Sequence, residues 1–517
     1  MKKTQNNFFN LLELKNNKFI TLFLYFIVFI FCIVLYLQTI NYNISGIDDD
    51  SFIRFTFNDY SIKDIFTKNV FLSDTTKTYY RPFLTLSFLI DNYIKQSPST
   101  MHTTNILLHA LCSILLLFFF KRYYFGTKVS ILATLLFAAH PINIFTAAWI
   151  PGRNDSLLCI FFLLSLIFFF EHLKYDKTGF LLLHFVAFIA ALFTKEIAII
   201  FPSIYLFYMF IENVKFDKKI FITASAYFFA VLFFLIIYKS LSYNIFKPSD
   251  YISNLIYNLK TILDYYAAAY FFDIHFSSYF GTKTLIVGTV SVILSFAFSY
   301  FSNLKKQEKI ICFLFPIFLM IMSFFAGRLF FQGNRIYIPL IFMIIPFCSF
   351  LIKHFNKKTV CVILSLLIAV SLIMTVEKQS TLKNELTLFE NIDNEAPDFE
   401  IHMANLYSYS LLKYGNLEKA AVKARQIAQK TEYKNTFNLY VLSIVYMHEK
   451  NYDKAVNILE RIVNFDKTDI YTKLVVCYDM LGNKEKSLYY YNILLQINDN
   501  NTEKVNEMIR REKNVLY

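Results

Sequence analysis

Three consecutive carboxylates stand at the start of the first long polar stretch of this sequence. The segment Gly46-Ile-Asp-Asp-Asp50 follows an apolar run after only a few residues. Three adjacent carboxylates beside a membrane repel one another unless water, a cation or a reacting partner compensates their charge. A carboxylate in such a place can take a proton from a hydroxyl group that is about to react. The structural alternative, which spacing alone favours, is a solvated acidic loop or a helix N-cap.

Further ionisable residues border apolar runs later in the chain. Such residues are expensive at membrane depth and are therefore functional suspects. An arginine can clamp a phosphate through paired hydrogen bonds, whereas a lysine contributes a point charge. The candidates for phosphate or substrate contacts are Arg81, His102, His109, Arg153, Asp155, Lys195, Glu196 and Arg335.

Several of these candidates have a structural alternative. His109 is also a candidate for a hydrogen-bonded core histidine. Arg153 with Asp155, and Lys195 with Glu196, are close enough in sequence to form local ion pairs that hold helix ends. Both interpretations stay open at the level of the sequence.

The composition shows what kind of scaffold must position these residues. Of 517 residues, 56% are hydrophobic and only 17% are charged, whereas soluble domains carry about 25% charged residues. An ordinary cytosolic enzyme is therefore disfavoured. The net charge of +13 comes from lysines that lie between apolar runs, which indicates membrane topology and no nucleic-acid partner. The seven cysteines form no CxxC motif, so neither a disulfide framework nor a zinc site is predicted. We expect no metal and no other cofactor.

Long apolar runs predict about eleven membrane-spanning helices. The first run, Phe19–Leu37, follows four lysines and no cleavage signal follows it, so we interpret it as a retained signal anchor with a cytoplasmic N-terminus. Lysine-rich loops alternate with loops poorer in Lys and Arg, as the positive-inside rule requires. The other runs lie near Asn105–Phe120, Val129–Ala139, Ser156–Phe170, Gly179–Phe193, Ile197–Ile211, Ile220–Tyr238, Thr284–Phe301, Ile310–Ala326, Ile336–Ile352 and Thr359–Val376.

An odd number of spans places the polar segment 41–103 and the C-terminal region on the outward face of the cell (inner or cytoplasmic) membrane. One segment, Leu255–Phe272, decides this parity. It is apolar enough to cross but carries Lys260 and Asp264. We favour a re-entrant or interfacial helix there, and a crossing would turn the C-terminal region inward.

A charged helical repeat begins after the membrane domain (1–376) and a linker (377–396). Its small residue is Ala420, then Ala455, then Ser487, at steps of 35 and 32 residues that bracket the 34 of the tetratricopeptide repeat. Tyr446 and Tyr478 occupy the aromatic position of the first helix in their units. About three repeats are predicted in residues 397–517, which is the minimum for a self-supporting stack. The fold class is therefore all-α, a polytopic bundle followed by a tetratricopeptide solenoid.

The motif order resembles one known family. From about Gly46 to Pro202 the chain carries Ile-Asp-Asp-x-x-Phe-Ile, Tyr-Tyr-Arg-Pro-x-x-x-x-Ser, His-x-x-Asn-x-x-x-His, Leu-Phe-Ala-x-His-Pro, Ala-x-Trp-Ile-x-Gly-Arg-x-Asp and Thr-Lys-Glu. This series is similar to the transmembrane and tetratricopeptide-repeat-containing O-mannosyltransferases and their bacterial relatives, which have the GT-C glycosyltransferase fold. Asn334-Arg-x-Tyr-x-Pro339 is similar to the family's later Glu-Arg-Tyr-x-Tyr-x-Pro.

The resemblance implies an outward-facing glycosyltransferase. Asp48 and Asp49 would be the acidic pair that acts as catalytic base or orients the acceptor. Arg81, Arg153 or Arg335 would contact the phosphate of a polyprenyl-phosphate-linked sugar.

Lys195 and Glu196 would lie near the pocket, and the acceptor would be a hydroxyl group, expected on a protein bound in the repeat groove. Mannose is one candidate sugar. Asn334 replaces the family's usual Glu, which puts that acidic contact in doubt. The rival from another class is a non-catalytic membrane-anchored scaffold, which would have no need of Asp48 and Asp49.

Overall fold

The structure is a computed structural model of the chain. It describes residues 18–46, 49–54, 59–72, 79–211, 218–241, 251–275, 282–321, 333–395 and 401–516. These residues form helices and no strand, which confirms the all-α prediction for the part of the chain described. They divide into two compact units, the first ending at Glu385 and the second beginning at Leu386.

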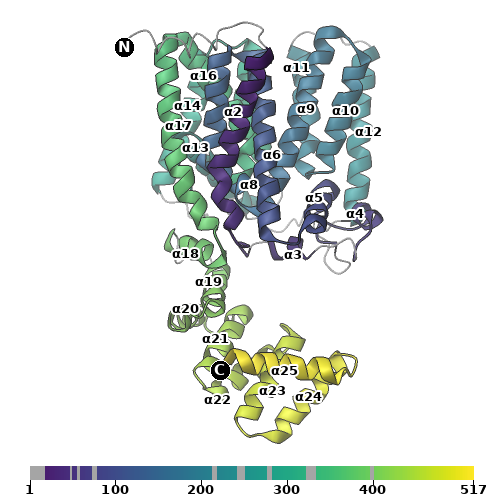
Figure 1. Cartoon of the computed structure of the whole chain (residues 1–517), viewed down its shortest axis with the longest axis vertical. Coiled ribbons are helices and arrows are strands. Elements are labelled where there is room, and N and C mark those ends of the chain that lie inside the picture. Colours follow the sequence, from purple (N-terminus) through teal and green to yellow (C-terminus); the bar gives the residue numbers. More distant parts are fainter. Residues whose placement is uncertain are drawn as a thin grey trace. The chain divides into compact units, whose positions relative to one another are not determined.

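The first unit is a helical bundle (Figure 1). Each predicted apolar run overlaps one of its helices. Their bounds are α2 Lys18–Tyr36, α6 Pro98–Phe119, α7 Thr127–Ala139, α9 Arg153–Tyr175, α10 Thr178–Leu192, α11 Phe201–Ile211, α12 Lys218–Leu241, α14 Thr282–Phe301, α15 Lys306–Ile321, α16 Tyr337–His354 and α17 Lys357–Gln379.

The predicted count of eleven spans is not confirmed. Within the described residues, seven helical stretches are long and apolar enough to cross a membrane. An eighth is obtained if α7 and the segment Pro141–Ala147, bent by 50°, count as one span. The remaining runs correspond to α10, α11 and α15, with 15, 11 and 16 residues, shorter than the roughly 20 residues of a typical span. The chain is thus a multi-pass membrane protein with a lower span count by this measure.

The segment that decides the parity forms α13 (Tyr251–Phe271). It is not among the seven span-like stretches. It packs closely on α14, where a Cβ built on Gly288 would lie 2.3 Å from the backbone oxygen of Leu263. Only glycine allows this approach of the two helices.

Short helices cover one end of the bundle. Figure 1 shows α3 (Asp49–Ile53), α4 (Ile62–Thr67) and α5 (Pro82–Ile94) at the end opposite the N-terminal end of α2. We call this the polar end. It also holds the N-terminal ends of α6 and α9, because Arg153 contacts side chains and backbone of α5 and α6.

The first and last helices of the bundle meet at the polar end. Gln379 donates from Nε2 to the backbone oxygen of Leu35 at 3.3 Å. The backbone N–H of Asn43 donates to the oxygen of Lys383 at 2.9 Å. Gly46 has φ of +78°, and a Cβ there would lie 2.7 Å from Cγ of Glu385. The chain therefore leaves the first unit at the same end at which the segment after α2 begins.

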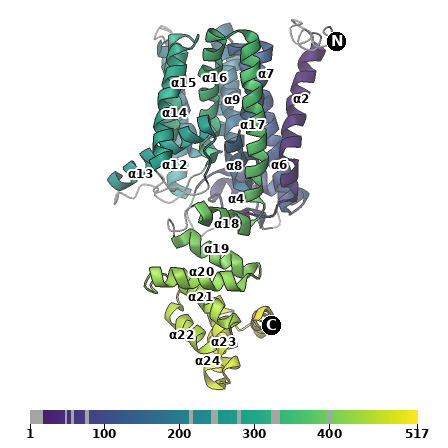
Figure 2. The ribbon, with the colours of Figure 1, turned by 90° about the vertical axis from the view of Figure 1, so that its left-hand side faces the viewer.

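The second unit is a succession of helix pairs (Figure 2). Two of the turns between paired helices contain a glycine in the left-handed region, Gly415 at φ +78° and Gly482 at φ +73°. Ala420, Ala455 and Ser487 are buried, as close packing of the paired helices requires. The helices are α18 Glu385–Glu395, α19 Ile401–Lys413, α20 Leu417–Lys430, α21 Thr436–His448, α22 Tyr452–Leu459, α23 Lys467–Met480, α24 Lys484–Ile497 and α25 Thr502–Leu516.

The predicted linker 377–396 is largely helical. α17 continues to Gln379 and α18 occupies Glu385–Glu395. The identity of the repeats as tetratricopeptide units stays a prediction.

Candidate active site

Arg81 and Glu196 form a paired ion bridge at the polar end. Arg81 immediately precedes α5, whose first residue is Pro82, a position where proline's missing N–H is not needed. Its Nη2 and Nε donate to the two oxygens of Glu196 at 2.6 and 3.0 Å. The guanidinium also stacks on Tyr79, 4.2 Å from the ring centre. The two charged side chains are 11% and 26% exposed, so this is a bridge that solvent still reaches.

Lys195, next to Glu196, points to a different partner. Its Nζ donates to both oxygens of Asp155 at 2.7 and 2.8 Å. Asn334 donates from Nδ2 to the same carboxylate at 2.6 Å. All three residues are buried. Burial lowers the pKa of the Lys195 ammonium below its ordinary value, and the neighbouring carboxylate of Asp155 offsets only part of this effect. The contacts join the first turn of α9, the segment after α10 and the segment ahead of α16.

Arg153 is sealed inside the bundle. Its side chain is 0% exposed and pairs with Asp91 of α5 at 2.5 Å. It also donates to Asn105 Oδ1 at 2.7 Å and to the backbone oxygen of Met101 at 2.8 Å. Its guanidinium lies 4.2 Å from the ring centre of Phe88. Such a residue braces α5, α6 and α9 against one another, and it is not placed to meet a phosphate from outside.

Neither of the two local ion pairs that the sequence suggested is formed. Arg153 pairs with Asp91 in place of Asp155, and Lys195 pairs with Asp155 in place of Glu196. The physical reason is that side chains one or two residues apart at the beginning of a helix point in different directions. Each charged group therefore finds its partner on another element.

The two histidines are buried in the bundle. His109 has its Nδ1 2.6 Å from the hydroxyl of Tyr337 and its Nε2 3.1 Å from the backbone oxygen of Ala138. This is the core-histidine arrangement that the sequence left open. His102 is 2% exposed and packs edge-on against Tyr42 at 6.2 Å. Neither ring is presented at the surface of the polar end.

The acidic pair is described in part. Asp48 lies outside the described residues. Asp49 begins α3 and is 1% exposed. Its Oδ2 accepts from the backbone N–H of Ser45 at 2.5 Å and from the Ser45 hydroxyl at 2.8 Å. The carboxylate is therefore held in one orientation, next to the glycine that packs on Glu385.

Arg335 lies in the short helical segment Gly333–Ile336 and is half-buried. Because its neighbour Asn334 contacts Asp155, Arg335 belongs to the same end of the bundle as Arg81. These contacts gather the polar side chains at one end of the bundle.

Sequence reasoning missed Asp91. The signal was present, because Asp91 and Asn92 interrupt an otherwise apolar helix. Its Oδ1 accepts from the hydroxyl of Thr104 at 2.7 Å and its Oδ2 meets Arg153. Burial of an ionised carboxylate is costly unless the charge is paired, and Arg153 is its partner here.

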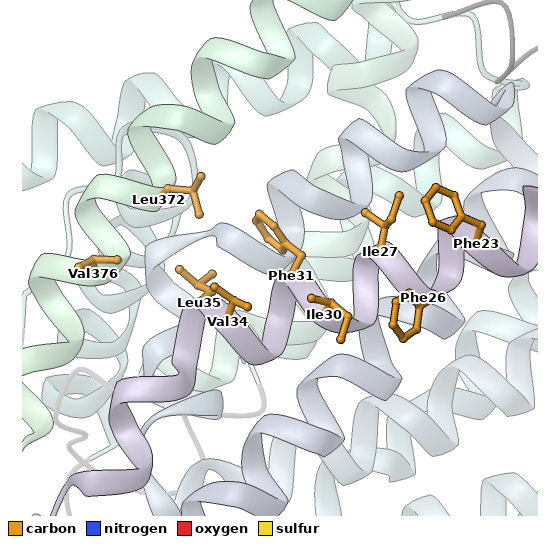
Figure 3. Close-up of a pocket in the computed structure, with 9 residues that line it drawn as sticks. All are labelled: Phe23, Phe26, Ile27, Ile30, Phe31, Val34, Leu35, Leu372 and Val376. Atoms are coloured by element: carbon orange, nitrogen blue, oxygen red, sulfur yellow. The ribbon is translucent and has the colours of Figure 1, made fainter. Parts of the chain in front are cut away.

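A separate apolar groove runs between α2 and α17 (Figure 3). It has no ionisable lining residue, so it offers neither an acid nor a phosphate contact. Its lining residues are Phe23, Phe26, Ile27, Ile30, Phe31, Val34, Leu35, Leu372 and Val376. Within the described chain, no group of three or more His, Cys, Asp and Glu residues is arranged to hold a metal ion.

Comparisons with known proteins agree with the motif order. Residues 94–238 match the family model described as dolichyl-phosphate-mannose-protein mannosyltransferase. Mouse protein O-mannosyl-transferase TMTC4 is 37% identical over 122 residues, which are 21% of this chain and 16% of the relative. Mouse TMTC1 is 30% identical over 161 residues, 28% of this chain and 17% of the relative.

Mouse TMTC2 is 39% identical over 94 residues, 18% of this chain and 11% of the relative. The chain thus spans less than a fifth of the length of these curated relatives. The matches confirm the resemblance to protein O-mannosyl-transferases that the motifs predict.

Proposed function

We propose that this chain is a GT-C-type glycosyltransferase that moves mannose from a polyprenyl-phosphate carrier onto a hydroxyl group of a protein. The observation that carries the proposal is the Arg81–Glu196 bridge at the polar end. A guanidinium has five N–H donors, and Glu196 uses two of them. A partly exposed arginine fixed by a carboxylate and an aromatic ring is suited to bind a phosphate with its other donors.

The chemistry proposed for this end needs only a general base for the acceptor hydroxyl and cationic side chains that bind the donor phosphate. Asp48 or Asp49 takes the proton of the acceptor hydroxyl as its oxygen attacks the anomeric carbon. The bond from that carbon to the phosphate oxygen breaks on the opposite face, so the configuration inverts. The lipid phosphate leaves as a dianion, and Arg81 and Arg335 stabilise the charge that develops on it. The acceptor proton remains on the aspartate.

Arg153 has no direct part in this proposal. It is fully buried and satisfied by Asp91, Asn105 and backbone oxygens. In this proposal Arg153 has a structural role: it holds α9 against α5, the helix that Arg81 precedes.

The proposal places the polar end on the outward face of the bacterial cytoplasmic membrane, where a carrier lipid presents its sugar. The chain leaves the bundle at the polar end, next to Asn43–Gly46. The second unit, taken as tetratricopeptide repeats, would then stand on the same face and present an acceptor polypeptide in its groove. The alternative function is a scaffold without catalysis.

The test is transfer in vitro by the purified full-length chain in liposomes. Polyprenyl-phosphate-linked radioactive mannose and a library of Ser/Thr peptides are supplied, with the glucose-linked carrier as the matched donor. We expect mannose on peptide hydroxyls with wild-type protein and about a hundredfold less with Asp48→Asn. Absence of transfer from both donors, together with unchanged glycoproteins in cells that lack the chain, would favour the scaffold.

A further inference from the structure

Asp155 contacts the sequence neighbours of residues on both sides of the proposed phosphate site: Lys195, next to the partner of Arg81, and Asn334, next to Arg335. It lies in the first turn of α9, and it is 4% exposed. Its carboxylate accepts two hydrogen bonds from Lys195 and one from Asn334, all between 2.6 and 2.8 Å. A buried carboxylate with such contacts has one orientation available to it, because any rotation leaves a buried donor unpaired.

The first connection runs to Arg81. Lys195 and Glu196 are consecutive, and Lys195 has an extended backbone with φ −157° and ψ 134°. Side chains that follow one another in extended backbone point to opposite sides. Lys195 therefore turns inward to Asp155 while Glu196 turns to Arg81, and the position of the one sets the position of the other.

The second connection runs to Arg335. Asn334 precedes Arg335 in the segment Gly333–Ile336, and the Asn334–Asp155 hydrogen bond spans 179 residues of sequence. Two glycines allow this approach, because both lie against Phe145. A Cβ on Gly152 would lie 2.0 Å from the backbone oxygen of Phe145, and one on Gly333 would lie 2.3 Å from Cδ2 of its ring.

Asparagine at position 334 is chemically matched to this contact. An amide can donate to Asp155, whereas a glutamate, the residue usual in the resembling family, would bring a second carboxylate to the same buried point. Two carboxylates there would require a shared proton or another cation. With Asn334 the Asp155–Lys195 pair is neutral as a whole.

We propose that Asp155 is a positioning residue that holds Arg81 and Arg335 in register for one phosphate. It does so through Lys195–Glu196 on one side and Asn334 on the other. This inference rests on the proposed function, which assigns the two arginines to the donor phosphate. It changes the role of Asp155 and Lys195 from substrate contact to support of these two arginines.

The experiment is a double-mutant cycle on the full-length chain in liposomes, with polyprenyl-phosphate mannose as donor. Asp155→Asn and Asn334→Ala should each raise the KM for the donor about tenfold, with the KM for the acceptor peptide within twofold of wild type. The double variant should be no worse than the poorer single variant, since both act through one contact. Glu171→Gln is the matched control, because Glu171 accepts two hydrogen bonds from Arg122 away from the polar end.

Multiplicative effects in the double variant would overturn the proposal. So would a fall in kcat alone at unchanged donor KM, because that is the result of a smaller folded fraction.

A second measurement does not depend on activity. Phenylglyoxal modification of Arg81 and Arg335 is followed by peptide mass spectrometry, and both rates should rise about threefold in Asn334→Ala while that of Arg122 stays constant. A response of one arginine only, or of neither, would contradict the joint positioning. Wild-type protein without transfer activity would refute the proposed function, and the modification rates would still decide the role of Asp155.

Discussion

Arg81 and Glu196 are 115 residues apart in sequence and are joined by two hydrogen bonds of 2.6 and 3.0 Å. The bridge fixes the chain ahead of α5 to the chain between α10 and α11. Because it uses two donors of a planar fork, it depends on the shape of the guanidinium as well as on its charge.

Arg81→Lys should therefore lower kcat/KM for the lipid donor by about tenfold or more despite the retained charge. A lysine cannot hold Glu196 through two parallel hydrogen bonds and still address a phosphate. The measurement is donor kinetics in liposomes. Arg122→Lys is the control, since Arg122 also makes two hydrogen bonds to one carboxylate, Glu171. Wild-type kinetics in Arg81→Lys would mean that the phosphate is held elsewhere.

Asp48→Asn and Asp49→Asn should each lower transfer by about a hundredfold or more, the usual range for loss of a general base. Ser45→Ala should have a smaller effect, because it leaves the Asp49 carboxylate and removes only the hydroxyl that orients it. Asp50→Asn is the matched control among the three aspartates. Full activity in both Asp48→Asn and Asp49→Asn would exclude the pair as the catalytic base.

Asp91→Asn should destabilise the first unit by about 3–5 kcal/mol, the range for removing one partner of a buried ion pair. The variant leaves the charge of Arg153 buried without its carboxylate. Thermal unfolding in detergent measures this change. Glu432→Gln is the control, since its ion pair with Lys434 is exposed, at 74% and 77%, and such pairs contribute little. Equal stability of both variants would show that Arg153 does not depend on Asp91.

Single cysteines at Asn41 and Asn483, in a background without the seven native cysteines, should both react with an impermeant thiol reagent on intact cells. Both positions are exposed, and the chain leaves the first unit beside Asn43. Labelling at Asn41 but not at Asn483, with both labelled after lysis, would place the second unit inside. Reaction at neither site before lysis would invert the whole topology.

The helices of the first unit could largely be predicted from long apolar runs, and the number of membrane crossings could not. Every predicted apolar run overlaps a helix in the described part of the chain, because a run of Phe, Ile and Leu in a membrane satisfies its backbone by forming a helix. Span length is a different property. α10 and α11 are separated by Thr194-Lys-Glu196, in which Lys195 and Glu196 pair with Asp155 and Arg81 elsewhere in the bundle.

The partners of the charged residues were the least predictable part of the site. The motifs named Arg81, Arg153, Lys195 and Glu196 as candidates, and the structure brings all four to the polar end. It could not tell that Glu196 belongs to Arg81 and Asp155 to Lys195. Pairing between distant elements depends on how the helices pack. That packing depends in part on uncharged positions such as Gly152 and Gly333, where the absence of a Cβ allows close approach to Phe145.

The only tryptophan of the chain, Trp149, lies immediately before Ile150–Gly152, four residues before Arg153, where α9 starts. It is 8% exposed, and its backbone oxygen accepts from Asn105 at 2.8 Å, the residue that also contacts Arg153. Its fluorescence is consequently a built-in optical reporter of the polar end. Titration with a polyprenyl phosphate should change its emission without any label, and a lipid that stays in the groove between α2 and α17 should leave the emission constant.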